Sequence, residues 1–293
     1  MKKCTVVCSL GGLLAALLCS TLAMAGPAVV ADGTPNLGTA AIQMQDARWF
    51  VEGRIYDVND DQSWSDNSTF SLGFASPINE DTEFDLSFST INNTGGDPIA
   101  GSLWTSDRTV LSPYLKRCFS HDGKVKFSLT AGADVALSQA KGTSAAGTAY
   151  QNDITPALRL QAEWGNPGQV QWQLAAQVAF WDTWAGTNGG GPIPGFGTVV
   201  ALGGGVSVPM GAKLTLVGDV MAIADGSNVV NSDTGLLDTQ TIWSAGGNWN
   251  LGGPYNSVVK VFATNSMGPT VASSAIGAPN DSIGLGLAYL RDF

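Results

Sequence analysis

Most residues of this chain that could do chemistry are charged side chains at alternate positions of apolar segments. Alternate residues of a β-strand point to the same side, so these charges would form rows on one face of a sheet. The face opposite the bulky apolar residues carries Arg48, Glu52, Arg54, Glu83, Asp85, Lys126, Asp134, Arg159, Glu163, Asp219 and Lys260. Rows of opposed charge can line a narrow aqueous path and set its preference for ions or solutes.

A second group of oxygen-bearing side chains stands in an acidic loop. Asp57, Asn59 and Asp61 alternate as the ligands of a calcium loop do. Gln62 stands where such a loop needs glycine, and Ser68 stands where it needs glutamate. The sequence therefore predicts a solvated acidic loop. Loose binding of Ca²⁺ or Mg²⁺ by Asp57, Asn59 and Asp61 is the alternative, and no other cofactor is expected.

The single histidine, His121, is the strongest candidate for catalytic proton transfer. Its neighbours Ser120 and Asp122 are the other residue types of a hydrolytic triad. Both are also common in turns, and the segment 119–123 joins two predicted strands. We therefore expect a turn with no catalytic residue and a protein that is not an enzyme. A membrane hydrolase that depends on His121 is the alternative.

Twelve segments with a two-residue period would position the charged rows. The segment 124–137 is the most regular, with apolar residues such as Phe127 and Leu129 alternating with Lys126 and Ser128. It lacks the 3.6-residue spacing of an amphipathic helix. The predicted strands are 47–56, 68–76, 82–91, 108–119, 124–137, 154–164, 169–181, 197–208, 213–224, 241–250, 257–264 and 282–293.

The connections between these segments alternate in length. Five are short and rich in Gly, Pro, Asn and Asp, as tight turns require. The six long connections are 57–67, 92–107, 138–153, 182–196, 225–240 and 265–281. Short turns on one side, long external loops on the other and an even number of strands are typical of barrels in the bacterial outer membrane.

The last segment and the distribution of aromatic residues support a membrane barrel. The segment 282–293 alternates bulky and small residues and ends on Phe293. Aromatic girdles are expected where strands cross the membrane interfaces. On the predicted lipid-facing parity, one end carries Trp49, Phe119, Trp164, Trp172, Trp249 and Phe293, and the other carries Phe70, Phe180 and Trp243.

The N-terminus has the pattern of a secretory signal peptide. Lys2 and Lys3 precede the apolar stretch 10–22, and Ala23-Met24-Ala25 forms a cleavage motif. We therefore expect cleavage after Ala25, giving a signal peptide (1–25), a periplasmic lead-in (26–46) and a barrel (47–293). Cleavage would change the net charge from −10 to −12, which argues against nucleic acid as a partner. One cysteine of the four would remain, so no disulfide framework is expected.

Taken together, these features resemble bacterial outer-membrane β-barrels of the porin and small-channel kind, whose final Phe is recognised during assembly. The resemblance implies an all-β fold, a transmembrane antiparallel up-and-down barrel of about twelve strands. The implied function is passive diffusion of ions or small hydrophilic solutes across the outer membrane. The implied partners are outer-membrane lipid, lipopolysaccharide, the barrel-assembly machinery and the solutes themselves.

The sequence does not decide whether the lumen of the barrel is open or filled. Barrels of about eight strands fill with side chains, whereas those of 16–18 enclose a channel, and twelve falls between. Abundant Gly and Ala on the inner face favour a passage, and the near balance of charge predicts weak ion selectivity. A closed structural or surface-adhesion barrel acting through its external loops is the alternative. The sequence leaves open the oligomeric state and whether residues 26–46 plug the lumen.

Overall fold

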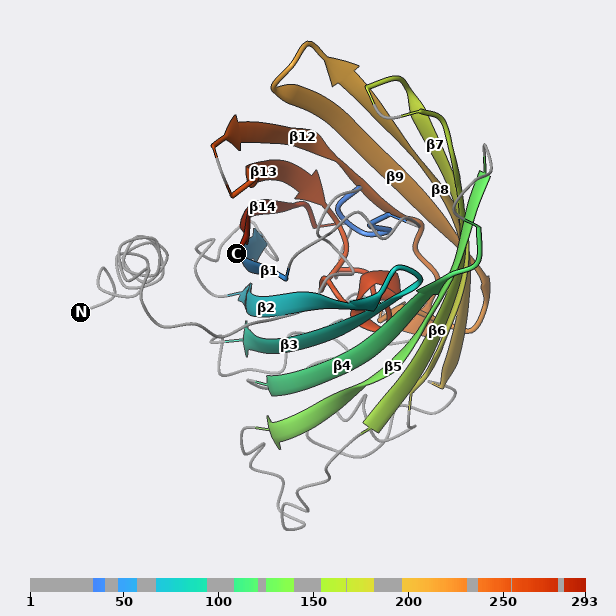
Figure 1. The fold of residues 1–293 in the computed structure, drawn as a ribbon. Coiled ribbons are helices and arrows are strands. Elements are labelled where there is room, and N and C mark those ends of the chain that lie inside the picture. Colours follow the sequence, from blue (N-terminus) through green and yellow to red (C-terminus); the bar gives the residue numbers. More distant parts are fainter. Residues whose placement is uncertain are drawn as a thin grey trace, which may run out of the picture.

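A computed structural model of the chain describes residues 34–39, 47–56, 67–93, 108–120, 125–139, 154–166, 168–181, 197–230, 237–253, 255–278 and 282–293. Its strands form a closed antiparallel barrel (Figure 1). The barrel strands are β1 (Arg48–Tyr56), β2 (Asn67–Asn79), β3 (Thr82–Asn93), β4 (Arg108–Cys118), β5 (Val125–Gln139), β6 (Ile154–Trp164), β7 (Gln171–Phe180), β8 (Thr198–Met210), β9 (Leu214–Asp225), β12 (Ile242–Gly252), β13 (Ser257–Thr264) and β14 (Gly284–Asp292). The short strands β10 (Val229–Val230) and β11 (Leu237–Asp238) pair outside it.

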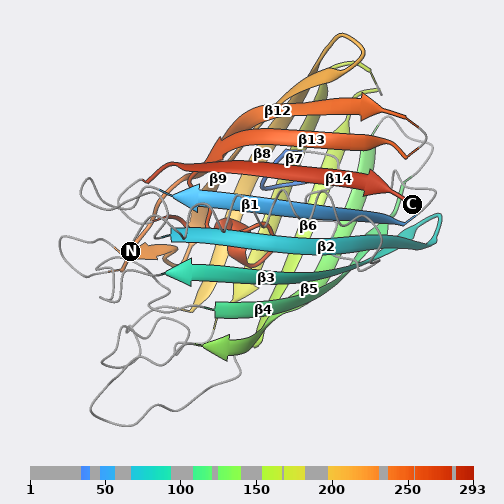
Figure 2. The ribbon, with the colours of Figure 1, turned by 90° about the vertical axis from the view of Figure 1, so that its left-hand side faces the viewer.

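The barrel closes where its first and last strands pair, from Arg48 opposite Asp292 to Tyr56 opposite Gly284. Figure 2 shows β14 beside β1, and the C-terminus at the same end as the turn between β2 and β3. We call this the short-turn end and the opposite one the long-loop end. The predicted all-β barrel is confirmed, and every predicted strand boundary lies within three residues of the observed one.

Burial alternates along the strands as the two-residue period predicts. In β6, Arg159 is 1% exposed, whereas its neighbour Leu160 is 59% exposed. Inward residues of this strand are polar or small, and outward residues are mostly apolar. An apolar outer face with polar groups inside suits a barrel surrounded by lipid.

All nine aromatic residues predicted to face lipid are at least partly exposed. Phe119, Trp172, Trp249 and Phe293 are each about half exposed and lie at the short-turn end. Nearby, the Arg117 guanidinium lies 5.9 Å from the centre of the Phe119 ring, which places this charge on the outer face. None of the helices in the described parts of the chain has the length and apolar character needed to cross a membrane.

Several inward glycines make room for aromatic rings. The Phe262 ring lies against Gly286 on β14, and the Tyr56 ring lies against Gly284. These glycines had suggested places where the lumen stays open. Instead, the rings of adjacent strands occupy the space that a side chain would take.

Replacing Gly286 with alanine should therefore destabilise the barrel. The new Cβ would overlap the Phe262 ring, and overpacking of this kind costs about 1–3 kcal/mol. Urea unfolding followed by tryptophan fluorescence would measure the loss. Gly197→Ala is the matched control, because a Cβ at Gly197 has open space around it. Equal unfolding midpoints for the two variants would contradict the role of this contact.

Candidate functional site

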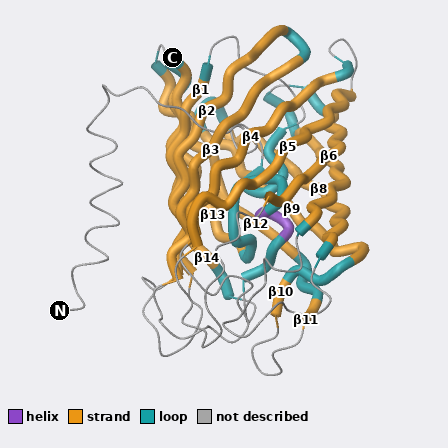
Figure 3. The backbone as a smooth tube through the Cα atoms, turned by 90° about the horizontal axis from the view of Figure 1, so that it is seen from below, coloured by secondary structure: helices purple, strands orange, loops and turns teal. Residues whose placement is uncertain are grey.

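Residues 265–278, here called the lumen loop, lie inside the barrel between β13 and β14. Every residue of the lumen loop is buried, and its centre is a short 3₁₀ turn, Ser273–Ala275. Figure 3 shows this turn enclosed by the strands. The segment 265–281 was predicted to be a long external loop, and for residues 265–278 that prediction is wrong.

Apolar packing explains why the lumen loop folds inward. Val271, Ala272 and Ile276 belong to one buried cluster with small inward residues of the wall, including Ala157 and Ala201. Exposing these apolar groups at the cell surface would cost about 25 cal/mol per Å². The alanines that had suggested an aqueous passage leave room for the lumen loop instead.

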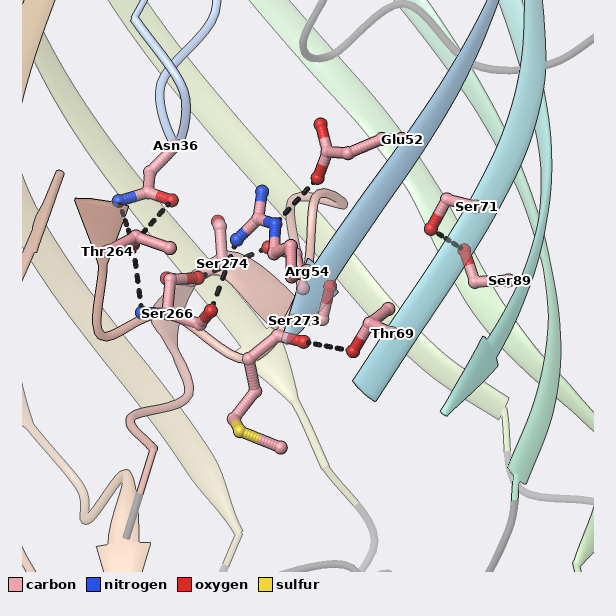
Figure 4. A network of polar contacts seen from close by, with 12 residues as sticks. Asn36, Glu52, Arg54, Thr69, Ser71, Ser89, Thr264, Ser266, Ser273 and Ser274 are labelled. Atoms are coloured by element: carbon pink, nitrogen blue, oxygen red, sulfur yellow. Dashed lines mark hydrogen bonds and ion pairs between the residues drawn. The ribbon is translucent and has the colours of Figure 1, made fainter. Parts of the chain in front are cut away.

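Polar contacts fasten the lumen loop to β1 and β2. The carbonyl of Ser266 accepts hydrogen bonds from Tyr56 Oη at 2.6 Å and Arg54 Nη1 at 3.1 Å. Thr69 Oγ1 donates to the carbonyl of Met267 at 3.1 Å. Figure 4 shows Arg54 and Thr69 reaching the loop from adjacent strands.

The lumen loop is also fastened to the wall at β4 and β5. Asp134 accepts hydrogen bonds from Thr270 Oγ1 at 2.6 Å and from Tyr114 Oη at 3.0 Å. Outside the barrel sheet, Asn228 Nδ2 donates to the carbonyl of Ala275, and the Asn228 carbonyl accepts from Gly277 N. The loop thus bonds to the wall and to the segment that leads into β10.

A second segment, Thr34–Thr39, also lies in the lumen and is called the N-terminal insert. It forms a turn in which Gly38 N donates to the carbonyl of Thr34. Asn36 donates through its backbone N and its Nδ2 to the two carboxylate oxygens of Asp219, each at 2.9 Å. Thr39 Oγ1 donates to Glu163. These six residues belong to the stretch 26–46, which was predicted to be a periplasmic lead-in.

Arg159 joins the two inserted segments to the wall. Its guanidinium donates to the carbonyls of Leu37 at 2.9 Å and Asn36 at 3.0 Å, both in the N-terminal insert. It also donates to Ser274 Oγ of the lumen loop at 2.8 Å, and twice to Gln177 Oε1 on β7. One buried side chain therefore bonds to both inserted segments and to the adjacent strand.

Three further pairs of opposite charge lie along the wall. Arg54 Nε bonds to Glu52 at 2.6 Å, and the Arg54 guanidinium lies 5.2 Å from the centre of the Phe262 ring. Lys116 Nζ lies 3.6 Å from Glu83. Arg48 pairs with Asp292 across the strands that close the barrel. Side chains of opposite charge that are paired in this way partly cancel each other's electrostatic field in the lumen.

The structure places the eleven predicted lumen residues on the inward parity. Ten are buried, and Lys126 is half-buried opposite Glu163 in the register of β5 and β6. The prediction that they line a permeation path stays a prediction. The predicted metal ligands Asp57, Asn59 and Asp61, and also His121, lie outside the described residues. Within the described residues, no group of three or more His, Cys, Asp or Glu could hold a metal ion.

Sequence reasoning missed several residues of the lumen. Lys116 and Arg117 are adjacent in the strand 108–119, so the sequence does not decide which of the two faces inward; Lys116 is inward and buried. Tyr56 and Tyr114 are also inward and buried, but aromatic residues were expected on the lipid-facing side. Asn36 lies in a segment with no periodic signal. The best available signal for Lys116 was the polar residue Ser112 on the same parity.

The barrel resembles solved structures of outer-membrane channels. The COG4313 outer membrane channel from Pseudomonas putida F1 matches with a TM-score of 0.50 and 9% identity, covering 86% of this chain and 97% of that one. The KdgM porin has a TM-score of 0.48 and 8% identity, and the match covers 84% of this chain and 99% of that one. The CymD monoaromatic hydrocarbon channel has a TM-score of 0.47 and 12% identity, and the match covers 93% of this chain and 98% of that one.

No protein-family model matches the chain, and no curated protein matches it. At these low identities the structural likeness establishes the fold alone. The chain has the closed twelve-stranded antiparallel fold of a porin-like outer-membrane channel.

Proposed function

We propose that this protein is an outer-membrane channel for the passive diffusion of ions or small hydrophilic solutes, with a lumen gated by its two inserted segments. The observation that carries the proposal is the chemistry of the wall. Twelve charged side chains, the eleven predicted ones and Lys116, face inward, and the outer face is mostly apolar. Burying so many charges costs free energy, and a purely structural barrel could be filled more cheaply with apolar residues.

Hydrogen bonds to the inserted segments suit a gate. Asp219, Arg159 and Gln173 hold the N-terminal insert through contacts that water can replace when the insert moves. The near balance of inward charge supports weak ion selectivity. The same proposal includes export by a signal peptide cleaved after Ala25, with Gly26 as the first residue of the mature protein.

A closed barrel that acts through its external loops is the second candidate. The specific observation in its favour is the apolar packing of the lumen loop, because Val271, Ala275 and Ile276 are buried as completely as residues of a soluble core. In this case the inward charges would serve only to hold the lumen filled.

Single-channel recording in a planar bilayer under a KCl gradient separates the two candidates. We expect discrete current steps and a reversal potential near zero. A variant that lacks residues 26–39 should carry at least several-fold more time-averaged current, because the N-terminal insert is removed. Absence of current from both proteins, once each is shown to be folded and inserted, would refute the channel and leave the closed barrel.

A further inference from the structure

A polar cavity of about 210 Å³ lies between the N-terminal insert and the short-turn end of the barrel. Thr39 of the insert borders it, together with Glu163 on β6 and Gln173 on β7. At the rim it reaches Lys213, in the turn between β8 and β9. A solute approaching from the short-turn end would therefore meet this cavity before the inserted segments.

Amide and hydroxyl side chains form an arc around the cavity. Gln171 and Gln173 project from the same face of β7, and Asn248 projects from β12. Between them stand Ser207, opposite Gln171 in the register, and Thr215, opposite Asn248. Each of these groups can both donate and accept a hydrogen bond. The arc therefore matches the hydroxyl groups of a solute, which also donate and accept.

The charges around the cavity favour neither cations nor anions. Glu163 supplies one negative charge and Lys213 one positive charge. The Glu163 carboxylate accepts hydrogen bonds from Thr39 at 2.5 Å and from Gln173 at 3.1 Å. Lys213 is exposed at the rim. An ionic solute would lose hydration here with little compensating charge, and an apolar one would leave the amides unpaired.

We propose that this cavity binds a small neutral polyhydroxyl solute, a monosaccharide or a sugar alcohol. The inference deepens the proposed function by naming a solute class, and its physiological meaning rests on that function. Binding would bring the solute against Thr39, so occupancy would add contacts to the N-terminal insert. The binding itself is measurable without any current through the barrel.

Saturation-transfer NMR on the full mature chain in detergent micelles tests binding, with D-glucose and sorbitol as probes. Potassium gluconate and 1-hexanol are the ionic and apolar comparisons. The test variant is Gln171→Met/Asn248→Leu, which removes two amides and keeps side-chain size. Asn166→Leu, in the exposed turn after β6, is the control because Asn166 does not line the cavity. A thermal unfolding curve for each variant establishes that it is folded.

The expected result is millimolar binding of both neutral probes, weakened at least tenfold in the double variant and unchanged in the control. Equal binding of gluconate or 1-hexanol would overturn the assignment of the solute class. Equal binding of glucose by the folded double variant would overturn the site. Binding of the probes without current in bilayers would support the solute site and refute the channel. Current without binding would support the channel and refute the solute site. If the double variant does not fold, Gln171→Met alone is tested, with at least a threefold loss expected.

Discussion

Replacing Arg159 with methionine is expected to raise the time-averaged current through the protein at least tenfold. The substitution removes three hydrogen bonds to the inserted segments, two to carbonyls of the N-terminal insert and one to Ser274 Oγ. A hydrogen bond to a charged group contributes about 1.5–3 kcal/mol. Allowing for the packing that methionine restores, a net loss of about 3 kcal/mol would shift the equilibrium toward released segments about a hundredfold.

The measurement is single-channel recording of the purified variant beside the wild-type protein. Arg117→Met is the matched control, because Arg117 is exposed on the outer face and stacks on Phe119. We expect this control to conduct as the wild type does. Unchanged current in folded Arg159→Met would show that the inserted segments are held without this side chain, and the proposed gate would lose its principal contact.

A second large effect is expected from Val271→Asp, which places a charge in the apolar packing of the lumen loop. Val271 is fully buried, and an unpaired carboxylate in such surroundings costs several kcal/mol. Expelling the lumen loop through the long-loop end would let the carboxylate reach water while leaving the strand pairing intact. We expect larger current steps than in the wild type.

Proteolysis of intact cells gives an independent measurement of the expelled loop. Thermolysin, which cleaves beside apolar residues, should cut near Ile276 in Val271→Asp and leave the wild-type barrel whole. Val271→Ala is the control, since it removes methyl groups and adds no charge, and we expect it to resist cleavage. Resistance of folded Val271→Asp would mean that the lumen loop stays in place despite the charge.

The fold could be predicted from the sequence because the two-residue period is a local signal. In β5, Phe127 alternates with Ser128 and Leu129 with Thr130, and this suffices to assign the strand and both of its faces. The closing of the barrel followed from the even number of strands and from the alternation of short and long connections. Both features can be recognised in the sequence without knowing which distant residues are in contact.

The contents of the lumen could not be predicted in the same way. An inward alanine such as Ala157 leaves equal room for water and for a folded loop, so its size alone does not decide between them. The contacts that decide join distant parts of the chain, as when Arg159 bonds to Ser274, 115 residues away. The apolar residues Val271 and Ile276 were the one local hint, but they lack the spacing of a strand or a helix.

The two inserted segments precede the two strands that close the barrel, with the N-terminal insert before β1 and the lumen loop just before β14. This arrangement constrains the order of folding. Asn36 and Asp219 are 183 residues apart, and the pair Arg48–Asp292 spans 244. The first contact needs the chain as far as residue 219 of 293, and the second needs nearly all of it. Both form slowly because a long chain must be ordered first. If β1 and β14 stay unpaired until both inserted segments are in place, neither segment has to be threaded into a barrel that is already closed. The last step of assembly would then be the pairing of β1 with β14 around lumen contents already in position.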